Sequence, residues 1–399
     1  MPRISLDGQF VEAEQGDTVA EALLRARITT FSRSIKYHRP RGPFCLSGSC
    51  GQCLMQIDGA PSQLACRVRV QEGMRCVRQN APLGADTDLL RAADFVFADG
   101  LDHHHLLTGS RILGLVALEV ARRLAGLGEL PAASQTAAAG SLREVRLAII
   151  GAGPAGLAAA RAAGPFALLI EREDRVGGAA LLGLAEAPAA AAGEVLLGAE
   201  CIGLYANDTK LPGNALLAVR FQDSLLVIAA EKVIVANGAA PQPLAFPGND
   251  RPGVYAARGL LALKARVGDK LIVVGEGNEL TGCASALRSK GYEVLREVRA
   301  SSAQKLRALG KPVRALAIDG ERVRCYAVAI AAGPAPLHEL ATSVGAKARW
   351  DSEIGGFPLQ VEADGRTSVP WLFAAGRVAG QGGARAVASG EAAGTACRE

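Results

Sequence analysis

Four of the nine cysteines in the chain lie within 22 residues of one another, at Cys45, Cys50, Cys53 and Cys66. Their spacing, Cys-x4-Cys-x2-Cys-x12-Cys, is close to the plant-type pattern in which three cysteines on one loop and a fourth beyond a hairpin ligate a [2Fe-2S] cluster. The glycines within the loop would let it turn tightly, so that backbone N–H groups point at the sulfur atoms of an anionic cluster. The pattern predicts that these four cysteines are the cluster ligands.

Two other interpretations of the cysteines are a tetrathiolate zinc site and a set of unligated core thiols. Zinc ribbons usually carry two Cys-x2-Cys knuckles, whereas this stretch has one, so the spacing favours the iron–sulfur cluster. Cys76 falls outside the pattern and is expected to be a small buried hydrophobic residue.

The elements that would position the cysteines can be read from the surrounding residues. Asp7-Gly8 and Asp58-Gly59 are hairpin signals between short apolar runs, and Thr18 with Glu21 forms a capping box ahead of a helix. We therefore expect an α+β ferredoxin-like [2Fe-2S] domain over residues 1–92, followed by a helical connector and linker over residues 93–142.

A second chemical signature begins at "VRLAIIGAGPAGLAAARAAGPFALLIERE". A predicted strand, Val145–Ile150, leads into Gly151-x-Gly153-x-x-Gly156 at the start of an alanine-rich helix, and Glu171 ends the next strand. In such a fold the glycines make the turn, admit a pyrophosphate and allow close helix–strand packing, while the acidic residue takes the adenosine ribose hydroxyls. The motif predicts an adenine dinucleotide site; its other candidate contacts are Pro154, Ala155 and Arg172.

Further motifs suggest which dinucleotide is bound. The stretches around Gly178, around Asn237 and Gly238, and around Gly376 and Arg377 resemble successive signatures of flavoprotein reductases with two dinucleotide-binding domains. The resemblance implies an α/β Rossmann-like fold that holds FAD over residues 143–250 and 331–399. Arg377 stands where that family normally has an aspartate bonding the ribityl chain, so either that contact is lost or supplied by backbone, or another adenine nucleotide takes the place of FAD.

The segment 251–330 is expected to form a second, inserted nucleotide-binding domain. Gly275 and Gly277 keep the first two glycines of a fingerprint, but Leu280 replaces the third and should crowd the helix against its strand. This difference favours a structural or degenerate domain over a working NAD(P) site, with ATP as another candidate occupant.

Composition excludes several other classes of function. The chain has 44 basic and 39 acidic residues, scattered along its length, which argues against a nucleic-acid-binding surface. No apolar run reaches bilayer length and the first residues lack a signal-peptide pattern, so we expect a cytoplasmic protein with no membrane span. His103–His105 could suggest a metal site, but they have no spaced partner and are interpreted as a loop near a cofactor or interface.

The stretch "RSIKYHRPRGPF" before the first cluster cysteine, with "GDTVAEALL" and "DGRTSVPWLFAAGRVAGQGGARAVASGEAAG", resembles one particular family. It is similar to the alpha-type FAD/[2Fe-2S] subunits of heteromeric sarcosine oxidases, the related dye-linked L-proline, opine and D-hydroxyproline dehydrogenases, and hydrogen cyanide synthase. The resemblance implies an electron-transfer subunit whose flavin-dependent partner subunit oxidises an amine or amino acid. An external electron acceptor and an FMN at the subunit interface are further implications.

Two functions of different class follow from these observations. In the first, the chain relays electrons from a partner subunit; in the second, it is a self-sufficient NAD(P)H-dependent flavoprotein and iron–sulfur reductase. Leu280 favours the first. A third interpretation, an assembly scaffold with a degenerate nucleotide site, rests on Arg377 alone. The sequence predicts no catalytic residue for the oxidation itself.

Overall fold

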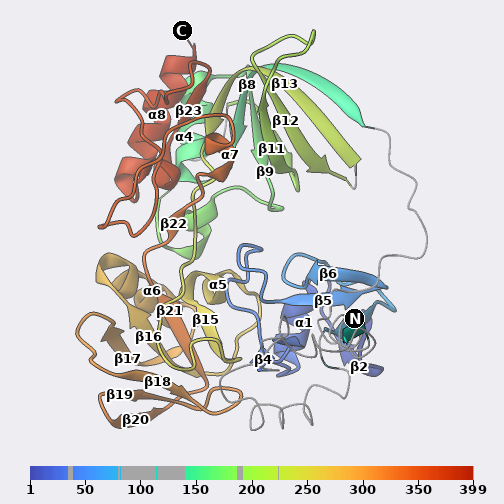
Figure 1. Ribbon diagram of the computed structural model, residues 1–399, viewed down its shortest axis with the longest axis vertical. Coiled ribbons are helices and arrows are strands. Elements are labelled where there is room, and N and C mark those ends of the chain that lie inside the picture. The colour runs from blue at the N-terminus through green and yellow to red at the C-terminus, as the bar shows by residue number, and fades with distance from the viewer. Residues whose placement is uncertain are drawn as a thin grey trace. The chain divides into compact units, whose positions relative to one another are not determined.

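The computed structural model describes residues 1–34, 39–79, 81, 114–115, 140–186, 192–222 and 224–398. The chain divides into two compact units, Met1–Ser134 with Pro243–Ala332 and Gln135–Gln242 with Gly333–Glu399. The predicted iron–sulfur domain and the inserted domain thus share one unit, and the two segments predicted to hold FAD share the other (Figure 1). Most of the predicted connector, including His103–His105, lies outside the described residues.

The N-terminal part of the first unit is a five-stranded sheet in the order β2-β1-β7-β5-β6, with one helix. Its elements are β1 Arg3–Leu6, β2 Gln9–Glu12, α1 Val19–Arg25, β5 Leu54–Ile57, β6 Ala60–Leu64 and β7 Arg75–Arg78, beside the short pair β3 Ser32–Arg33 and β4 Pro40–Arg41. Strand β7 runs parallel to β1, while the pairs β1/β2, β5/β6 and β5/β7 are antiparallel.

The local signals for these elements are confirmed. Both Asp-Gly dipeptides lie between paired strands with all four residues at positive φ, as tight hairpin turns require. The Thr18 hydroxyl accepts a hydrogen bond from the Glu21 N–H at 3.2 Å, and the Glu21 carboxylate accepts one from the Thr18 N–H at 2.8 Å. This reciprocal capping box starts α1 at the predicted residue.

The inserted segment contains a parallel sheet in the order β15-β21-β16-β17, as a nucleotide-binding fold requires. Its elements are β15 Val254–Ala256, α5 Ala257–Ala262, β16 Lys270–Gly275, α6 Gly277–Ser289, β17 Glu293–Arg299 and β21 Ala327–Ala331. An antiparallel sheet of β18 Leu306–Leu309, β19 Ala315–Ile318 and β20 Glu321–Arg324 adjoins it in the chain.

The second unit is built on a seven-stranded sheet in the order β10-β9-β8-β13-β12-β11, with β23 also paired to β13. Strands β8, β9, β10, β13 and β23 are parallel, and β11, β12 and β13 form an antiparallel meander. The strands are β8 Ser141–Ile150, β9 Ala167–Glu171, β10 Glu194–Leu197, β11 Glu200–Ala206, β12 Ala215–Phe221, β13 Ser224–Val235 and β23 Leu372–Ala374. Its other elements are α4 Pro154–Ala163, η2 Gly178–Leu182, β14 Ala239–Ala240, β22 Ala335–Pro336, α7 Glu339–Thr342, η3 Gly376–Ala379 and α8 Ala384–Arg398.

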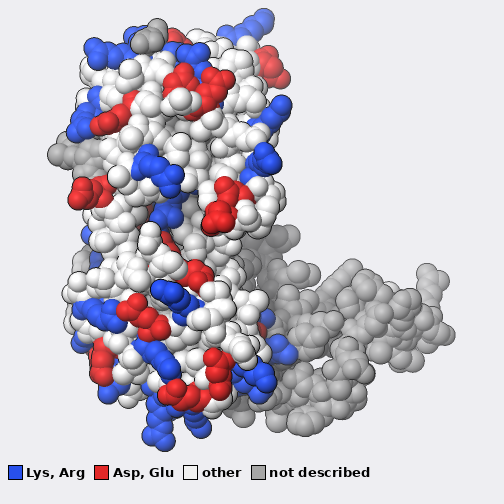
Figure 2. All heavy atoms as spheres, turned by 90° about the vertical axis from the view of Figure 1, so that its left-hand side faces the viewer, with Lys and Arg blue, Asp and Glu red and all other residues white. Residues whose placement is uncertain are grey.

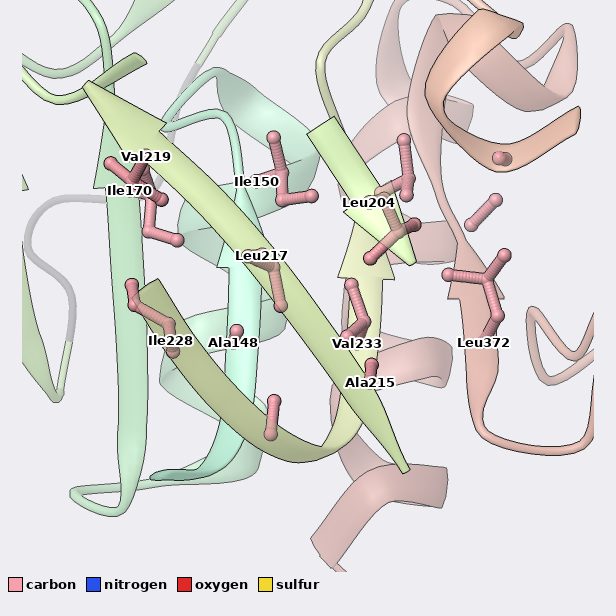
Figure 3. Packing of buried hydrophobic residues seen from close by; sticks show 14 of the residues in the cluster. Ala148, Ile150, Ile170, Leu204, Ala215, Leu217, Val219, Ile228, Val233 and Leu372 are labelled. Carbon is pink, nitrogen blue, oxygen red and sulfur yellow. The ribbon is translucent and has the colours of Figure 1, made fainter. Parts of the chain in front are cut away.

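The core of this unit forms on the two faces of its sheet. On one face the meander packs its apolar side chains over the parallel strands, and Figure 3 shows Leu217 and Val219 of β12 beside Ile150 and Ile170. On the other face α4 and α8 cover the sheet with alanines. The helices can approach closely because Gly390 has no side chain; a Cβ atom there would lie only 2.1 Å from the Ala155 carbonyl oxygen.

The structure also bears on two expectations drawn from composition. Figure 2 shows basic and acidic side chains interspersed on the described part of the face in view. Among the described residues, no helix combines the length and apolar character needed to cross a membrane. The cytoplasmic location stays a prediction.

Candidate redox centres

The four cysteines predicted to hold the cluster lie close to one another in the ferredoxin-like domain. Cys45, Cys53 and Cys66 are buried and Cys50 is half-buried. Hydrogen bonds from Cys50 and Cys66 lower the pKa of the Cys45 thiol, and the Cys66 thiol likewise lowers the pKa of Cys53. The same contacts, together with burial, raise the pKa of the Cys50 and Cys66 thiols, so the four thiols lie close enough to affect one another's ionisation.

The loop around these thiols fits an anionic cluster. The backbone N–H groups of Ser47 and Ser49 point at the Cys45 Sγ, at 3.5 and 3.2 Å. Gly48 and Gly51 have φ of +80° and +65°, which lets the loop fold back on itself as the sequence predicted. Such N–H···S contacts stabilise thiolate ligands and the negative charge of the cluster.

Two further observations concern alternatives to this site. Among the described residues, the four cysteines included, no group of three or more His, Cys, Asp or Glu side chains is arranged to hold a metal ion, so the cluster assignment rests on the cysteine spacing and on the N–H···S contacts of the loop. Cys76 is 1% exposed, and burial raises the pKa of its thiol to about 11, as expected of a hydrophobic core residue.

The second site lies where β8 meets α4. The Gly151 N–H donates to the Ile170 carbonyl at 2.8 Å, which joins the turn to β9. Helix α4 starts with Pro154 and has Gly153 as its N-cap, so no side chain covers the free N–H groups of its first turn. A Cβ atom at Gly153 would meet nothing within 4 Å, whereas one at Gly156 would lie 1.8 Å from the Gly151 carbonyl oxygen. The arrangement offers an anion the N–H groups and dipole of α4.

Glu171 lies beside this loop as the sequence predicted. Its side chain is 8% exposed, and its two carboxylate oxygens accept hydrogen bonds from the N–H groups of Ala152 at 2.7 Å and Glu173 at 2.9 Å. A carboxylate has about four lone-pair sites, so acceptor capacity remains for ribose hydroxyls. Arg172, by contrast, forms a partly exposed ion pair with Glu173.

The other candidate contacts are distributed around the start of α4. A Cβ atom at Gly178 would lie 3.1 Å from the Gly153 Cα, and one at Gly376 would lie 2.7 Å from the Ala155 Cβ. These two glycines therefore lie next to the glycine loop and the first residues of α4, Pro154 and Ala155. Gly238 has a φ of +77° and open space around it.

Asn237 and Arg377 have different environments. The Asn237 amide donates to the Leu337 carbonyl at 3.0 Å, while its Oδ1 is buried with no hydrogen-bond partner. Such an orphaned acceptor is suited to a ligand hydroxyl or N–H group. The Arg377 guanidinium packs against Gly382, and its Cζ would lie 3.3 Å from a Cβ atom placed there.

Two residues that shape this site were not identified from the sequence. The Ser389 hydroxyl accepts a hydrogen bond from the Gly376 N–H at 3.0 Å, and Gly390 admits α8 against α4. The repeated small residues of "ASGEAAG" were the available signal, since glycines four apart lie on one helix face.

We expect Glu171→Ala to weaken FAD binding by roughly 10- to 100-fold, because loss of a charged acceptor costs about 1.5–3 kcal/mol. The measurement is the Kd of the flavin-free protein for FAD, followed by quenching of flavin fluorescence. Glu173→Ala, on the same loop but partly exposed, is the matched control and should bind normally. Equal affinity in Glu171→Ala and the unmodified chain would contradict the assignment.

Comparisons with known proteins agree with the two predicted domain types. Residues 2–81 match the family described as "2Fe-2S iron-sulfur cluster binding domain", and residues 145–319 match "Pyridine nucleotide-disulphide oxidoreductase". The fold is shared with the L-proline dehydrogenase from P. horikoshii, with a TM-score of 0.68 and 21% identity over 94% of this chain and 68% of that one. The chain is therefore a flavoprotein oxidoreductase with an N-terminal iron–sulfur domain, and its cofactors are a [2Fe-2S] cluster and FAD.

Curated relatives narrow the class further. The chain is 28% identical to the sarcosine oxidase subunit alpha of Rhizobium meliloti (strain 1021), over 88% of its own length and 42% of that subunit. It is 39% identical to the hydrogen cyanide synthase subunit HcnA of Pseudomonas aeruginosa, over 18% of its own length and 68% of that subunit. The chain belongs to the family of alpha-type FAD/[2Fe-2S] subunits of heteromeric sarcosine oxidases, related dye-linked amino-acid dehydrogenases and hydrogen cyanide synthase. It spans less than half the length of the sarcosine oxidase alpha subunits that it matches.

Proposed function

We propose that this chain is the electron-transfer subunit of a heteromeric flavin-dependent amine or amino-acid dehydrogenase or oxidase. A partner subunit oxidises the substrate, and this chain passes the electrons to an external acceptor. Its FAD handles two electrons and its [2Fe-2S] cluster one at a time, which suits a relay between a two-electron oxidation and a one-electron acceptor. An FMN shared with the partner stays an expectation from the family resemblance.

The observation that carries the proposal is the presence of an acidic residue in the glycine turn of the second nucleotide fold. Glu276 occupies the middle of its Gly275-x-Gly277 turn, and its carboxylate accepts hydrogen bonds from the N–H and hydroxyl groups of Ser301. Glu279, in the first turn of α6, is paired with Arg258. Glu276 therefore brings a negative charge to the glycine turn, which opposes a phosphate there, whereas the charge of Glu279 is balanced by Arg258.

Leu280, which replaces the third glycine of the fingerprint, also argues against a working pyridine nucleotide site. Leu280 is 3% exposed and packs in the core, where the fingerprint has a residue small enough for the helix to approach its strand. Gly275 is retained because a Cβ atom there would lie 2.1 Å from the Ala331 carbonyl oxygen, a packing demand that holds with or without a ligand. Gly275 is therefore explained by packing alone and is not evidence for a phosphate site.

Input from a partner is tested by anaerobic reduction of the purified chain. Neither NADH nor NADPH should bleach the flavin absorbance near 450 nm on the timescale of turnover, and amines or amino acids should not bleach it either. Co-expression with a flavin-dependent amine-oxidising subunit should give a complex in which substrate reduces both cofactors. Rapid bleaching of the isolated chain by NADH or NADPH would instead establish the self-sufficient reductase, and turnover of an amine by the isolated chain would remove the need for a partner.

A further inference from the structure

Helix α5 of the second nucleotide fold packs directly against a cysteine of the cluster loop. A Cβ atom at Gly259 would lie 2.5 Å from the carbonyl oxygen of Cys45 and 3.2 Å from the Cβ of Leu46. Just before the helix, the Ala256 N–H donates to the Phe44 carbonyl at 2.9 Å. Phe44 and Cys45 are buried in one hydrophobic cluster with Val254 and Ala256. The backbone of Cys45 therefore rests on the backbone of α5.

An ion pair holds α5 to the start of α6. The Arg258 guanidinium forms two hydrogen bonds with the Glu279 carboxylate, Nε to Oε1 at 2.5 Å and Nη2 to Oε2 at 2.9 Å. The side chains are only 13% and 12% exposed, so solvent screens this pair weakly. Paired, planar hydrogen bonds of this kind fix orientation as well as distance.

The other end of α5 is fixed as well. The Lys290 ammonium donates to the carbonyl of Leu261 at 2.6 Å and to that of Leu263. The next residue, Lys264, donates its backbone N–H to the Glu21 carboxylate at 3.0 Å, joining α5 to the capping box of α1. Since a six-residue helix has little stability of its own, these contacts determine where α5 lies.

We propose that Arg258 and Glu279 are positioning residues for the [2Fe-2S] cluster, through which the second nucleotide fold sets the reduction potential of the cluster. Reduction adds one negative charge to the cluster, and the residue next to Arg258 is in contact with the ligand Cys45. Paired, the two charges nearly cancel at the cluster. Unpaired, either charge changes the electrostatic potential beside Cys45, because both groups are largely buried.

The sign of the effect separates this role from a purely structural one. In Glu279→Gln the Arg258 charge is left uncompensated, which favours the reduced cluster, so its equilibrium constant for reduction should rise about tenfold. Tenfold corresponds to about 59 mV for a one-electron couple. Arg258→Gln leaves the carboxylate behind and should shift the potential down or leave it unchanged. Arg258→Lys keeps the charge and should stay close to the unmodified chain.

The measurement is an EPR-monitored redox titration of the chain with its cluster loaded, which is independent of substrate turnover. The exposed pair Arg288 and Glu297, which joins α6 to β17, is the matched control, and Glu297→Gln should leave the midpoint potential unchanged. Shifts of the same sign in Glu279→Gln and Arg258→Gln, or none in Glu279→Gln, overturn the proposal. If Arg258→Gln fails to fold, the midpoint potentials of Glu279→Gln and Arg258→Lys are compared instead: a higher potential in Glu279→Gln alone supports the proposal, and equal potentials overturn it.

Discussion

Gly156→Ala should abolish FAD binding and destabilise the flavin-binding unit, while the iron–sulfur domain keeps its cluster. The added Cβ atom would lie 1.8 Å from the backbone carbonyl oxygen of Gly151, a distance that real Cβ contacts do not reach. Since the obstacle is backbone, no side-chain rotation relieves it, and α4 must move away from the turn between β8 and the helix. A cost of several kcal/mol is expected, on the scale of overpacked cores.

Gly153 provides a contrast within the same motif. A Cβ atom there meets no protein atom within 4 Å and the residue has a negative φ, so Gly153→Ala should leave the flavin-free protein as stable as before. If the pyrophosphate approaches the backbone at this residue, Gly153→Ala nonetheless loses affinity for both FAD and ADP. Thermal melting and ligand titration of Gly156→Ala, Gly153→Ala and Gly140→Ala as a benign control separate the two effects. Normal FAD affinity in Gly153→Ala would place the cofactor elsewhere.

Much of this site could be predicted from sequence because its signals are local. A strand, three glycines and an acidic residue at the end of the next strand define a phosphate loop within about 25 residues. The capping box before α1 and the two Asp-Gly turns are equally local. The start of β8 was placed too late: the strand begins at Ser141 and not at Val145, because its first residues are mostly polar and exposed and lack the apolar run that marks the buried half.

What the sequence could not give are contacts between residues far apart in the chain. Gly259 looks like an ordinary helical glycine until the fold places it against Cys45, more than 200 positions earlier. Arg258 and Glu279 likewise resemble solvated charges on an amphipathic surface, and only the structure shows that they form a buried ion pair. Residue type and spacing thus indicated candidate ligands for each cofactor, but not the residues that hold those candidates in place.

Serine at Cys45, Cys50, Cys53 or Cys66 should remove the [2Fe-2S] cluster. The unmodified chain should contain about two iron and two sulfide per molecule and give a rhombic EPR signal on reduction, as four-cysteine [2Fe-2S] proteins do. A serine hydroxyl is far less readily deprotonated than a thiol and is a harder ligand, so each substitution leaves the cluster with an incomplete set of soft anionic ligands. Iron and sulfide analysis with EPR spectroscopy measures the loss.

The four substitutions should differ in their structural consequences, since the sites differ in burial. Cys45, Cys53 and Cys66 are buried, and serine there also places a hydroxyl in the core, whereas Cys50 is half-buried on a loop whose neighbours Ser49 and Gly51 are exposed. Cys76→Ser is the matched control: it introduces the same hydroxyl at a position 1% exposed, so it should lose stability while retaining iron. If Cys76→Ser lost as much iron as Cys50→Ser, the iron content would depend on the stability of the domain and not on the identity of the ligands. Zinc in place of iron in the unmodified chain would falsify the cluster assignment, because a relay needs a centre that changes its oxidation state and zinc does not.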